Sequence, residues 1–272
     1  MTEDEVAGGG EPVAEETANE PEVPADERRA TDDAETDLAA QRELKRLSRR
    51  GFLTFGGGAV ASYAAWKWLR LRSKEDGVEW PLRRAFEFNE KVAEAYFRRG
   101  RLTRTFPPSA ITNARINGGE GLAADYDPST WTLDVLGHSL KLDDLKQLRS
   151  QTMITELRCI EGWSIIVKWT GIRVADLAAE LKAPNTRYVG METPDRGYYV
   201  GLDSQSALHP QTLLAYEMND RPLTWQHGAP VRLAIPVKYG VKNIKRVSKI
   251  EFTDTRPADF WAERGYDWYL GH

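Results

Sequence analysis

Residues 156–164, Glu156-Leu157-Arg158-Cys159-Ile160-Glu161-Gly162-Trp163-Ser164, contain the only cysteine among the 272 residues of the chain. The flanking stretches Met153–Leu157 and Ile165–Trp169 are typical of short strands, and the pair Glu161-Gly162 indicates a turn between them. The pattern therefore predicts a strand that delivers the Cys159 thiol to a turn. A thiolate is a soft metal ligand and a good nucleophile, and a nearby Arg158 favours the charged form. The alternative is a small buried core residue, since free cysteine is among the most buried residue types.

Charge divides the chain into two parts. Residues 1–40 hold fourteen acidic residues and two arginines, which leaves this segment at −12 and the remainder at +8. The basic excess begins just after residue 40, so the folded part is close to neutral and no nucleic-acid partner is predicted. A single cysteine excludes an intrachain disulfide framework, a CxxC zinc ribbon, a cysteine-ligated iron–sulfur cluster and CxxCH haem attachment.

The acidic beginning of the chain has almost no large apolar side chains. Such a segment cannot bury enough surface to offset the entropy lost on ordering. Residues 1–45 are therefore predicted to be a disordered acidic region.

An export signal is predicted over residues 46–72. The sequence Ser48-Arg49-Arg50-Gly51-Phe52-Leu53-Thr54 resembles a twin-arginine signal, with Thr in place of the usual Lys at its last position. A mildly apolar, glycine-rich run from Phe55 to Leu69 follows it. Because Trp66–Arg70 is typical of a membrane-interface belt, both a cleaved signal and a signal anchor stay open. The predicted location is periplasmic or otherwise extracytoplasmic.

Residues 75–272 are predicted to form one α+β domain with mixed β-sheets, since short strands outnumber helices and no regular βαβ alternation is visible. The expected helices are Ala85–Arg99, Leu142–Leu148 and Val174–Leu181, and the expected strands include Trp131–Val135, Tyr188–Thr193, Tyr198–Leu202 and Val247–Phe252. The sequence has no GxGxxG after a strand, no P-loop, no HExxH and no GxSxG. The segment Phe260–Tyr269 is unusually aromatic, and is expected either to pack back on the domain or to form a docking patch.

Polar, glycine-punctuated loops accompany the thiol. Residues Arg115–Gly119, His227–Arg232 and Tyr239–Lys245 offer cations and backbone N–H groups, which suit an anionic ligand. A thiol hydrolase with Cys159 as nucleophile and a histidine, His209 or His227, as base is one interpretation. No signature of a cysteine-protease family surrounds the cysteine.

Several of these stretches also resemble one family. Residues Arg158–Ser164 with Trp169-Thr170-Gly171, then Leu213–Asn219, His227–Arg232 and Lys242–Lys245, are similar in order and spacing to motifs of the sulfite oxidase family of molybdenum enzymes. This family includes a periplasmic branch, the catalytic subunit of methionine sulfoxide reductase. The resemblance runs from Pro108 to Thr253 and implies the sulfite oxidase-type molybdopterin-binding fold.

The resemblance implies a molybdenum cofactor with one pyranopterin. Cys159 would be the only protein ligand to the metal, which fits a soft thiolate. The further residues that it implies as cofactor contacts are Thr193, His227 and Arg232, then Asn243, Ile244 and Lys245 on the phosphate side. Ile244 is expected to contribute only its main chain.

The resemblance also implies two further catalytic residues, Arg115 and Tyr198, and one further cofactor contact, Asn117. Arg115 and Asn117 correspond to a family loop whose arginine approaches the metal, although Ile116 separates them here. Tyr198 corresponds to an active-site tyrosine, with its neighbour Tyr199 as a rival.

The implied activity is oxygen-atom transfer on a small S-oxide, N-oxide or sulfite-like substrate. The chain ends about 20 residues after the last family strand, so we expect no immunoglobulin-like dimerisation domain and a monomer. We also expect no haem domain before the module, and therefore electron exchange with a separate cytochrome or membrane haem protein. The alternatives are the thiol hydrolase and a non-catalytic cofactor-binding module.

Overall fold

The computed structural model describes residues 25–116, 118–124 and 126–271, with side chains from Glu35 onward. It divides into two compact units, Met1–Trp68 and Leu69–His272. Among the described residues, no helix combines the length and the apolar composition that a membrane span requires.

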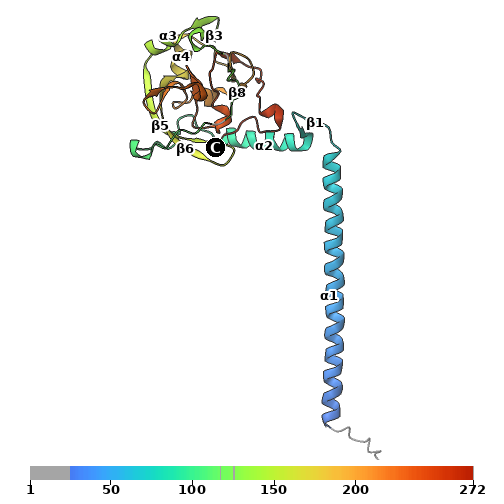
Figure 1. The fold of residues 1–272 in the computed structure, drawn as a ribbon. Coiled ribbons are helices and arrows are strands. Elements are labelled where there is room, and N and C mark those ends of the chain that lie inside the picture. The colour runs from blue at the N-terminus through green and yellow to red at the C-terminus, as the bar shows by residue number, and fades with distance from the viewer. Residues whose placement is uncertain (1–24, 117, 125, 272) are drawn as a thin grey trace, which may run out of the picture. The chain divides into compact units, whose positions relative to one another are not determined.

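The first long helix, α1 (Ala25–Arg70), includes residues 25–45, which the sequence analysis places in the disordered region (Figure 1). This part of α1 contains five Ala, three Glu and three Arg, which are strong helix formers and do not require a core. An ion pair one turn apart, Glu43 to Arg46 at 3.8 Å, adds a little support. The rest of the predicted disordered region, residues 1–24, lies outside the described residues.

The twin-arginine-like stretch lies within the same helix with its side chains exposed. Its last residue, Thr54, donates from Oγ1 to the carbonyl oxygens of Arg50 and Gly51.

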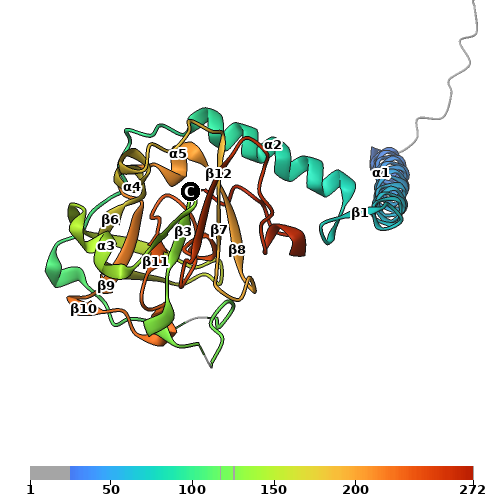
Figure 2. The same cartoon turned by 90° about the horizontal axis from the view of Figure 1, so that it is seen from above.

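The second unit begins with a short hairpin, β1 (Lys74–Glu75) and β2 (Val78–Glu79), and then α2 (Trp80–Tyr96). The helix starts five residues before the predicted Ala85, because Pro81 in its first turn has a φ already suited to a helix start. It ends where Phe97 adopts an extended conformation. Figure 2 shows α2 along one side of the sheets.

One antiparallel sheet carries the cysteine stretch. Its order is β10 (Arg221–Pro222), β9 (Leu213–Met218), β6 (Ser164–Arg173) and β5 (Ser150–Arg158), and β11 (Arg232–Ala234) also pairs with β9. The β6–β9 register shifts between Thr170 and Gly171. A Cβ at Gly171 would lie 2.1 Å from the Leu214 carbonyl oxygen, so only glycine permits this close approach of the strands.

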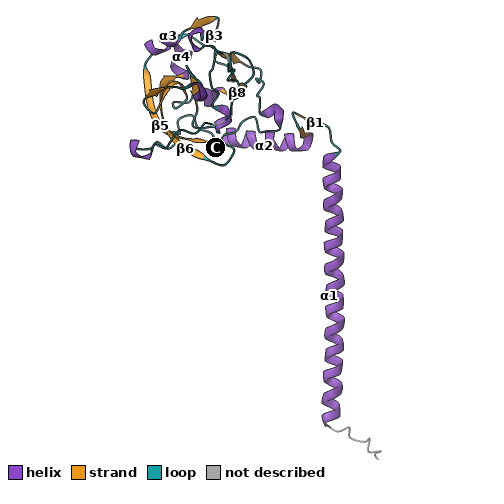
Figure 3. Ribbon diagram, in the orientation of Figure 1, coloured by secondary structure: helices purple, strands orange, loops and turns teal. Residues whose placement is uncertain are grey.

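The other main sheet has the order β4 (His138–Leu140), β3 (Leu133–Val135), β12 (Lys249–Thr253), β7 (Tyr188–Glu192) and β8 (Tyr199–Asp203). The β3–β12 pair is parallel and the other pairs are antiparallel. Leu133, Met191 and Ile250 of this sheet lie in the larger apolar core. The helices α3 (Leu142–Gln147), α4 (Val174–Glu180) and α5 (Ser204–Ala207) connect these strands (Figure 3).

The mixture of short helices and two mostly antiparallel sheets confirms the predicted α+β class. Between these elements lie the 3₁₀ turns η1 (Pro108–Ala110), η2 (Pro128–Thr130), η3 (Trp225–His227), η4 (Gly240–Lys242) and η5 (Ala262–Arg264).

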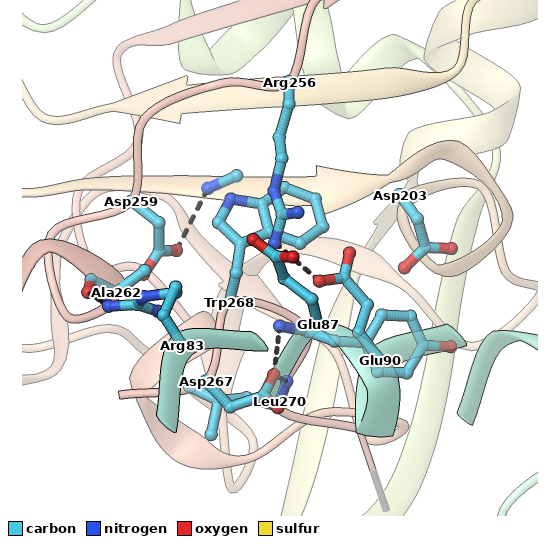
Figure 4. Close-up of polar contacts among 12 residues, drawn as sticks. Arg83, Glu87, Glu90, Asp203, Arg256, Asp259, Ala262, Asp267, Trp268 and Leu270 are labelled. Carbon is cyan, nitrogen blue, oxygen red and sulfur yellow. Dashed lines mark hydrogen bonds and ion pairs between the residues drawn. The ribbon is translucent and has the colours of Figure 1, made fainter. Parts of the chain in front are cut away.

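The aromatic C-terminal segment packs back on the domain. Arg83 of α2 donates to the carbonyl oxygens of Ala262 at 2.8 Å and Tyr266 at 3.0 Å. Lys242 of η4 pairs with the buried Asp259. Figure 4 shows Asp259 near Ala262 and Arg83. These contacts join residues far apart in the sequence, and they fix the segment against the loop that precedes β12.

Candidate functional site

The cysteine lies in the turn between β5 and β6, as the sequence predicts. The Cys159 N–H donates to the Trp163 carbonyl at 2.9 Å, and the Gly162 N–H donates to the Cys159 carbonyl at 3.1 Å. Gly162 has φ = +87°, a conformation that glycine adopts without steric cost. The thiol is 7% exposed and belongs to the wall of a pocket of about 330 Å³.

Three separate segments meet the cysteine turn around this pocket, which we call the thiol pocket. They are the residues before η2, the loop at η4 and the C-terminal aromatic segment, and two single residues, Tyr198 and Arg232, complete the wall. The lining residues are Gly118, Glu120, Leu157, Cys159, Ile160, Glu161, Tyr198, Arg232, Gly240, Val241, Asn243, Lys245, Trp261 and Tyr266. Sequence positions more than a hundred residues apart thus converge on one thiol.

Gly240 brings the η4 loop against the cysteine turn. A Cβ at this position would lie 3.2 Å from the Arg158 carbonyl oxygen and 3.5 Å from Cys159 Cα. Asn243 then holds the loop in shape, because its Oδ1 accepts from Ile235 N at 2.9 Å and its Nδ2 donates to the Tyr239 carbonyl at 3.2 Å. Ile244 is buried, its carbonyl accepts from Leu233 N at 2.9 Å, and it is not among the lining residues of the thiol pocket, so its main-chain contact with a cofactor stays a prediction.

Arg232 supplies a deeply buried cation. Its guanidinium is 3% exposed, donates to the carbonyl oxygens of His227 at 3.2 Å and Asn243 at 3.0 Å, and lies 5.0 Å from the Trp169 ring centroid. Burial lowers the pKa of Arg232 to about 10, so it remains charged at neutral pH. Among the described residues, the hydrogen bonds of Arg232 go to carbonyl oxygens, and no carboxylate forms an ion pair with it.

Lys245 adds a second cation on the same wall. It is 9% exposed and its Nζ donates to the Gly118 carbonyl at 3.0 Å. Burial, and then the charge of Arg232, lower the pKa of Lys245 to about 8, whereas Glu120 acts in the opposite direction. An anion bound beside these cations would be stabilised by both.

Neither predicted histidine lies on the wall of the thiol pocket in the part of the chain that the structure describes. Burial, Arg232 and Lys245 lower the pKa of His227 to about 4, so its ring is neutral at neutral pH. His209 is engaged elsewhere, since its Nδ1 accepts from Gln211 N and its Nε2 lies 3.2 Å from the Arg101 carbonyl oxygen. The hydrolase interpretation therefore finds no histidine base among the lining residues.

The side chains of Tyr198 and Tyr199 lie in different surroundings. Tyr198 lines the thiol pocket and donates from its phenol to the Val241 carbonyl, whereas the Tyr199 phenol donates to Glu263. Burial and the charge of Asp259 raise the pKa of Tyr198, which keeps the phenol protonated.

Thr193 lies next to Tyr198 and uses its hydroxyl in hydrogen bonds within the protein. Its Oγ1 donates to Asp195 at 2.6 Å and accepts from Tyr198 N at 3.1 Å, which closes the β7–β8 hairpin. It is not among the lining residues of the thiol pocket. Gly121, at φ = +70°, packs directly over it: a Cβ there would lie 2.4 Å from Thr193 Cγ2.

The loop with Arg115 reaches the cysteine turn by a different contact. The Arg115 guanidinium lies 4.6 Å from the ring centroid of Trp163, and its side chain is exposed and not part of the pocket lining. Asn117 lies outside the described residues, while Gly118 and Glu120 next to it line the thiol pocket.

Three lining residues lie outside every stretch that the sequence analysis assigned to the site: Glu120, Trp261 and Tyr266. The rings of Trp261 and Tyr266 form an edge-to-face pair, with centroids 5.2 Å apart. The aromatic composition of the C-terminal segment was the available signal. It did not indicate which of those side chains would face the thiol.

The donor set fits a molybdopterin. A thiol on the pocket wall provides a soft ligand, while two buried cations and the backbone of the η4 loop suit a phosphate. This chemistry follows from side chains present in the structure.

Comparisons with known proteins agree with this chemistry. Residues 120–261 match the family described as "Oxidoreductase molybdopterin binding domain". The chain is 30% identical over 256 residues to the "Putative protein-methionine-sulfoxide reductase subunit YedZ1" of Azospira oryzae, which covers 89% of this chain and 94% of that protein. It is 37% identical over 159 residues to the "Protein-methionine-sulfoxide reductase catalytic subunit MsrP" of Xanthomonas axonopodis pv. citri, covering 50% of this chain and 48% of that protein.

The alignment with that MsrP thus spans about half of its length. Among solved structures, the sulfane dehydrogenase SoxCD from Paracoccus pantotrophus is similar with a TM-score of 0.45 and 18% identity, over 49% of this chain and 41% of that one. The family match confirms the predicted resemblance, the fold class and the assignment as an oxidoreductase.

Proposed function

Since the chain belongs to the oxidoreductase molybdopterin-binding domain family, of the sulfite oxidase type, we propose that it reduces a sulfoxide-type substrate by oxygen-atom transfer. The observation that carries the proposal is the shared wall of one pocket: the Cys159 thiol together with the buried cations Arg232 and Lys245. The two relatives described as methionine-sulfoxide reductase subunits support the substrate class. Other S-oxides, N-oxides and sulfite are the competing substrates in the test.

The residues present divide the binding of a molybdenum–pyranopterin cofactor between them. Cys159 would be the sole protein ligand to the metal. Arg232, Lys245 and the backbone of Asn243 and Ile244 would hold the phosphate side, with His227 alongside. When bound, the cofactor supplies two-electron oxygen-atom transfer chemistry, while the protein binds and orients it.

Two side chains, Tyr198 and Arg115, would contact the substrate in this proposal. Tyr198 keeps its phenolic proton at neutral pH, and it would donate this proton to a substrate oxygen in exchange for its hydrogen bond to the Val241 carbonyl. Arg115, which lies over the Trp163 ring at the cysteine turn, would approach the substrate from outside the lining. Asn117, between Arg115 and the lining residue Gly118, stays a predicted cofactor contact.

The reaction requires electrons from elsewhere. A sulfoxide takes up two electrons and two protons, and yields a thioether and water. A separate one-electron carrier, a cytochrome or a membrane haem protein, would supply the electrons in two steps to a monomeric enzyme. The twin-arginine-like stretch on α1 supports export to the periplasm or an equivalent compartment, by the route that carries folded, cofactor-loaded proteins.

Metal analysis and a dye-linked assay test the proposal together. Protein from a cofactor-competent host should contain molybdenum near one equivalent and should oxidise reduced benzyl viologen when methionine sulfoxide is added. Cys159→Ser should fold normally, lose molybdenum and lose more than about a hundredfold in activity, since even outer-shell partners of a metal contribute 10- to 100-fold. Full activity in metal-free protein, or in Cys159→Ser, would refute the assignment.

A further inference from the structure

A second and larger pocket lies behind the strand that carries the cysteine. It has a volume of about 490 Å³, and its lining residues come from the C-terminal end of α2, residues 97–104 and the C-terminal end of the chain, together with Arg158 and Val237. Its lining includes the exposed side chains of Arg98, Arg101, Arg104 and Arg158, and none of the described residues that line it is acidic. We call it the arginine pocket. Apolar groups such as Leu102 complete its walls.

Most of this positive charge is not neutralised by neighbouring carboxylates. Arg158 pairs with Glu156 at 2.9 Å. Arg98 donates instead to backbone carbonyl oxygens, and Arg104 lies 4.8 Å from the ring centroid of Phe106. No hydrogen bond or ion pair of the Arg101 guanidinium is found within the described part of the chain. The pocket therefore presents an excess of positive charge to solvent.

The thiol pocket has the opposite arrangement. Its exposed charged residues are the acids Glu120 and Glu161, and its cations Arg232 and Lys245 are buried. A phosphate-bearing cofactor would compensate those cations further. An acidic macromolecule would thus be attracted to the arginine pocket and not to the opening of the thiol pocket.

The two pockets nevertheless meet at one point in the chain. Arg158 lines the arginine pocket, and the next residue, Cys159, lines the thiol pocket. A protein docked on the arginines would lie one peptide unit from the cysteine backbone.

We propose that the arginine pocket is the docking surface for an acidic one-electron carrier protein that supplies the electrons for turnover. The need for such a carrier rests on the proposed function. Two docking events deliver two electrons. With two protons from solvent, they balance the conversion of one sulfoxide to one thioether and water, in which the carrier is oxidised and the sulfoxide sulfur is reduced.

Charge reversal tests the docking surface directly. The full-length enzyme would be titrated with the soluble haem domain of cytochrome b5, an acidic one-electron carrier, at low ionic strength. Arg101→Glu/Arg104→Glu should weaken binding and slow association by about tenfold or more, and should reduce the salt dependence of both. Arg149→Glu/Arg221→Glu is the matched control, since it makes the same change in net charge at exposed arginines outside the arginine pocket.

Equal weakening in both double variants, or no weakening in the first, would overturn the proposal. Circular dichroism and dye-driven activity, which bypass the carrier, should be unchanged in Arg101→Glu/Arg104→Glu. If that variant misfolds, Arg101→Gln/Arg104→Gln provides the same comparison with half of the charge change. Binding needs no turnover, so absence of dye-driven sulfoxide reduction in the unaltered enzyme would refute the proposed function and leave the docking result readable.

Discussion

The second unit buries its cations in two different ways. Beside the C-terminal segment, the Nζ of Lys242 lies 2.5 Å from the Asp259 carboxylate, and both side chains are almost fully buried. In the thiol pocket, Arg232 donates to the Asn243 carbonyl oxygen and Lys245 donates to the Gly118 carbonyl oxygen. A carboxylate neutralises a buried charge within the fold, whereas a carbonyl dipole leaves the net charge in place. The first pair serves the fold, and the second set is suited to an anionic ligand.

The largest expected effect comes from breaking the buried Lys242–Asp259 ion pair. Asp259→Asn keeps the shape of the side chain but leaves the Lys242 ammonium without its countercharge in the protein interior. We expect a loss of about 3–5 kcal/mol in the free energy of unfolding. Chemical denaturation of the variant and the unaltered protein measures it.

A surface pair provides the control for that measurement. Asp220 pairs with Lys168 at 2.6 Å, with the Asp220 side chain 68% exposed. Asp220→Asn should cost less than about 1 kcal/mol. Similar losses in the two variants would show that burial does not distinguish the two pairs.

A smaller effect concerns the second kind of cation. Lys245→Met removes a charge that would hold the phosphate side of the cofactor, so affinity for molybdopterin should fall roughly ten- to hundredfold. The cofactor-free protein should be at least as stable as before, because a buried charge is replaced by an apolar group. Cofactor content after dialysis and thermal denaturation give the two readouts. Lys249→Met, at a more exposed lysine of β12, should change neither, and full loading of Lys245→Met would contradict the assigned role.

The smallest expected effect is on pH dependence. The pKa of Lys245 is about 8 in the folded protein, below the ordinary lysine value of 10.5, mainly because of burial. Between these values the unfolded chain binds more protons at this site, so stability rises as pH rises through that window. Lys238 is lowered to about 8 in the same way and acts in the same direction. In cofactor-free Lys245→Met, the free energy of unfolding measured by chemical denaturation should rise less steeply between pH 8 and 10. An unchanged slope would show that Lys245 does not contribute to the pH dependence of stability.

Much of the site could be predicted from local patterns. The Cys159 turn follows from two β-rich runs around a glycine, and such signals act over a few residues. The position of Tyr198 on the pocket wall also agrees with the sequence analysis, whereas the main-chain role of Ile244 stays a prediction. The predicted helix ends were less accurate, as at α2. Capping residues and prolines set where a helix ends, and helix propensity alone indicates these positions only weakly.

Thr193 marks where the predictions reached their limit. Its position at the end of β7 was predicted, but its hydroxyl contacts depend on a hairpin partner, Tyr198, and on Gly121 packed over it. The same holds for Trp261 and Tyr266, whose composition was visible while their contact with the thiol pocket was not. Burial and partner choice are set by residues far away in the chain.

By itself the sequence predicted the family, the thiol on the wall of the candidate site and the loops that offer cations, because each rests on motifs of residues close together in the chain. Only the tertiary structure decided which of those cations are buried beside the thiol and which, like Lys242, are neutralised by a distant acid. It also decided that four exposed arginines gather behind the cysteine strand. The physical reason is that desolvation and countercharge depend on packing between segments up to a hundred residues or more apart, to which local sequence patterns are blind.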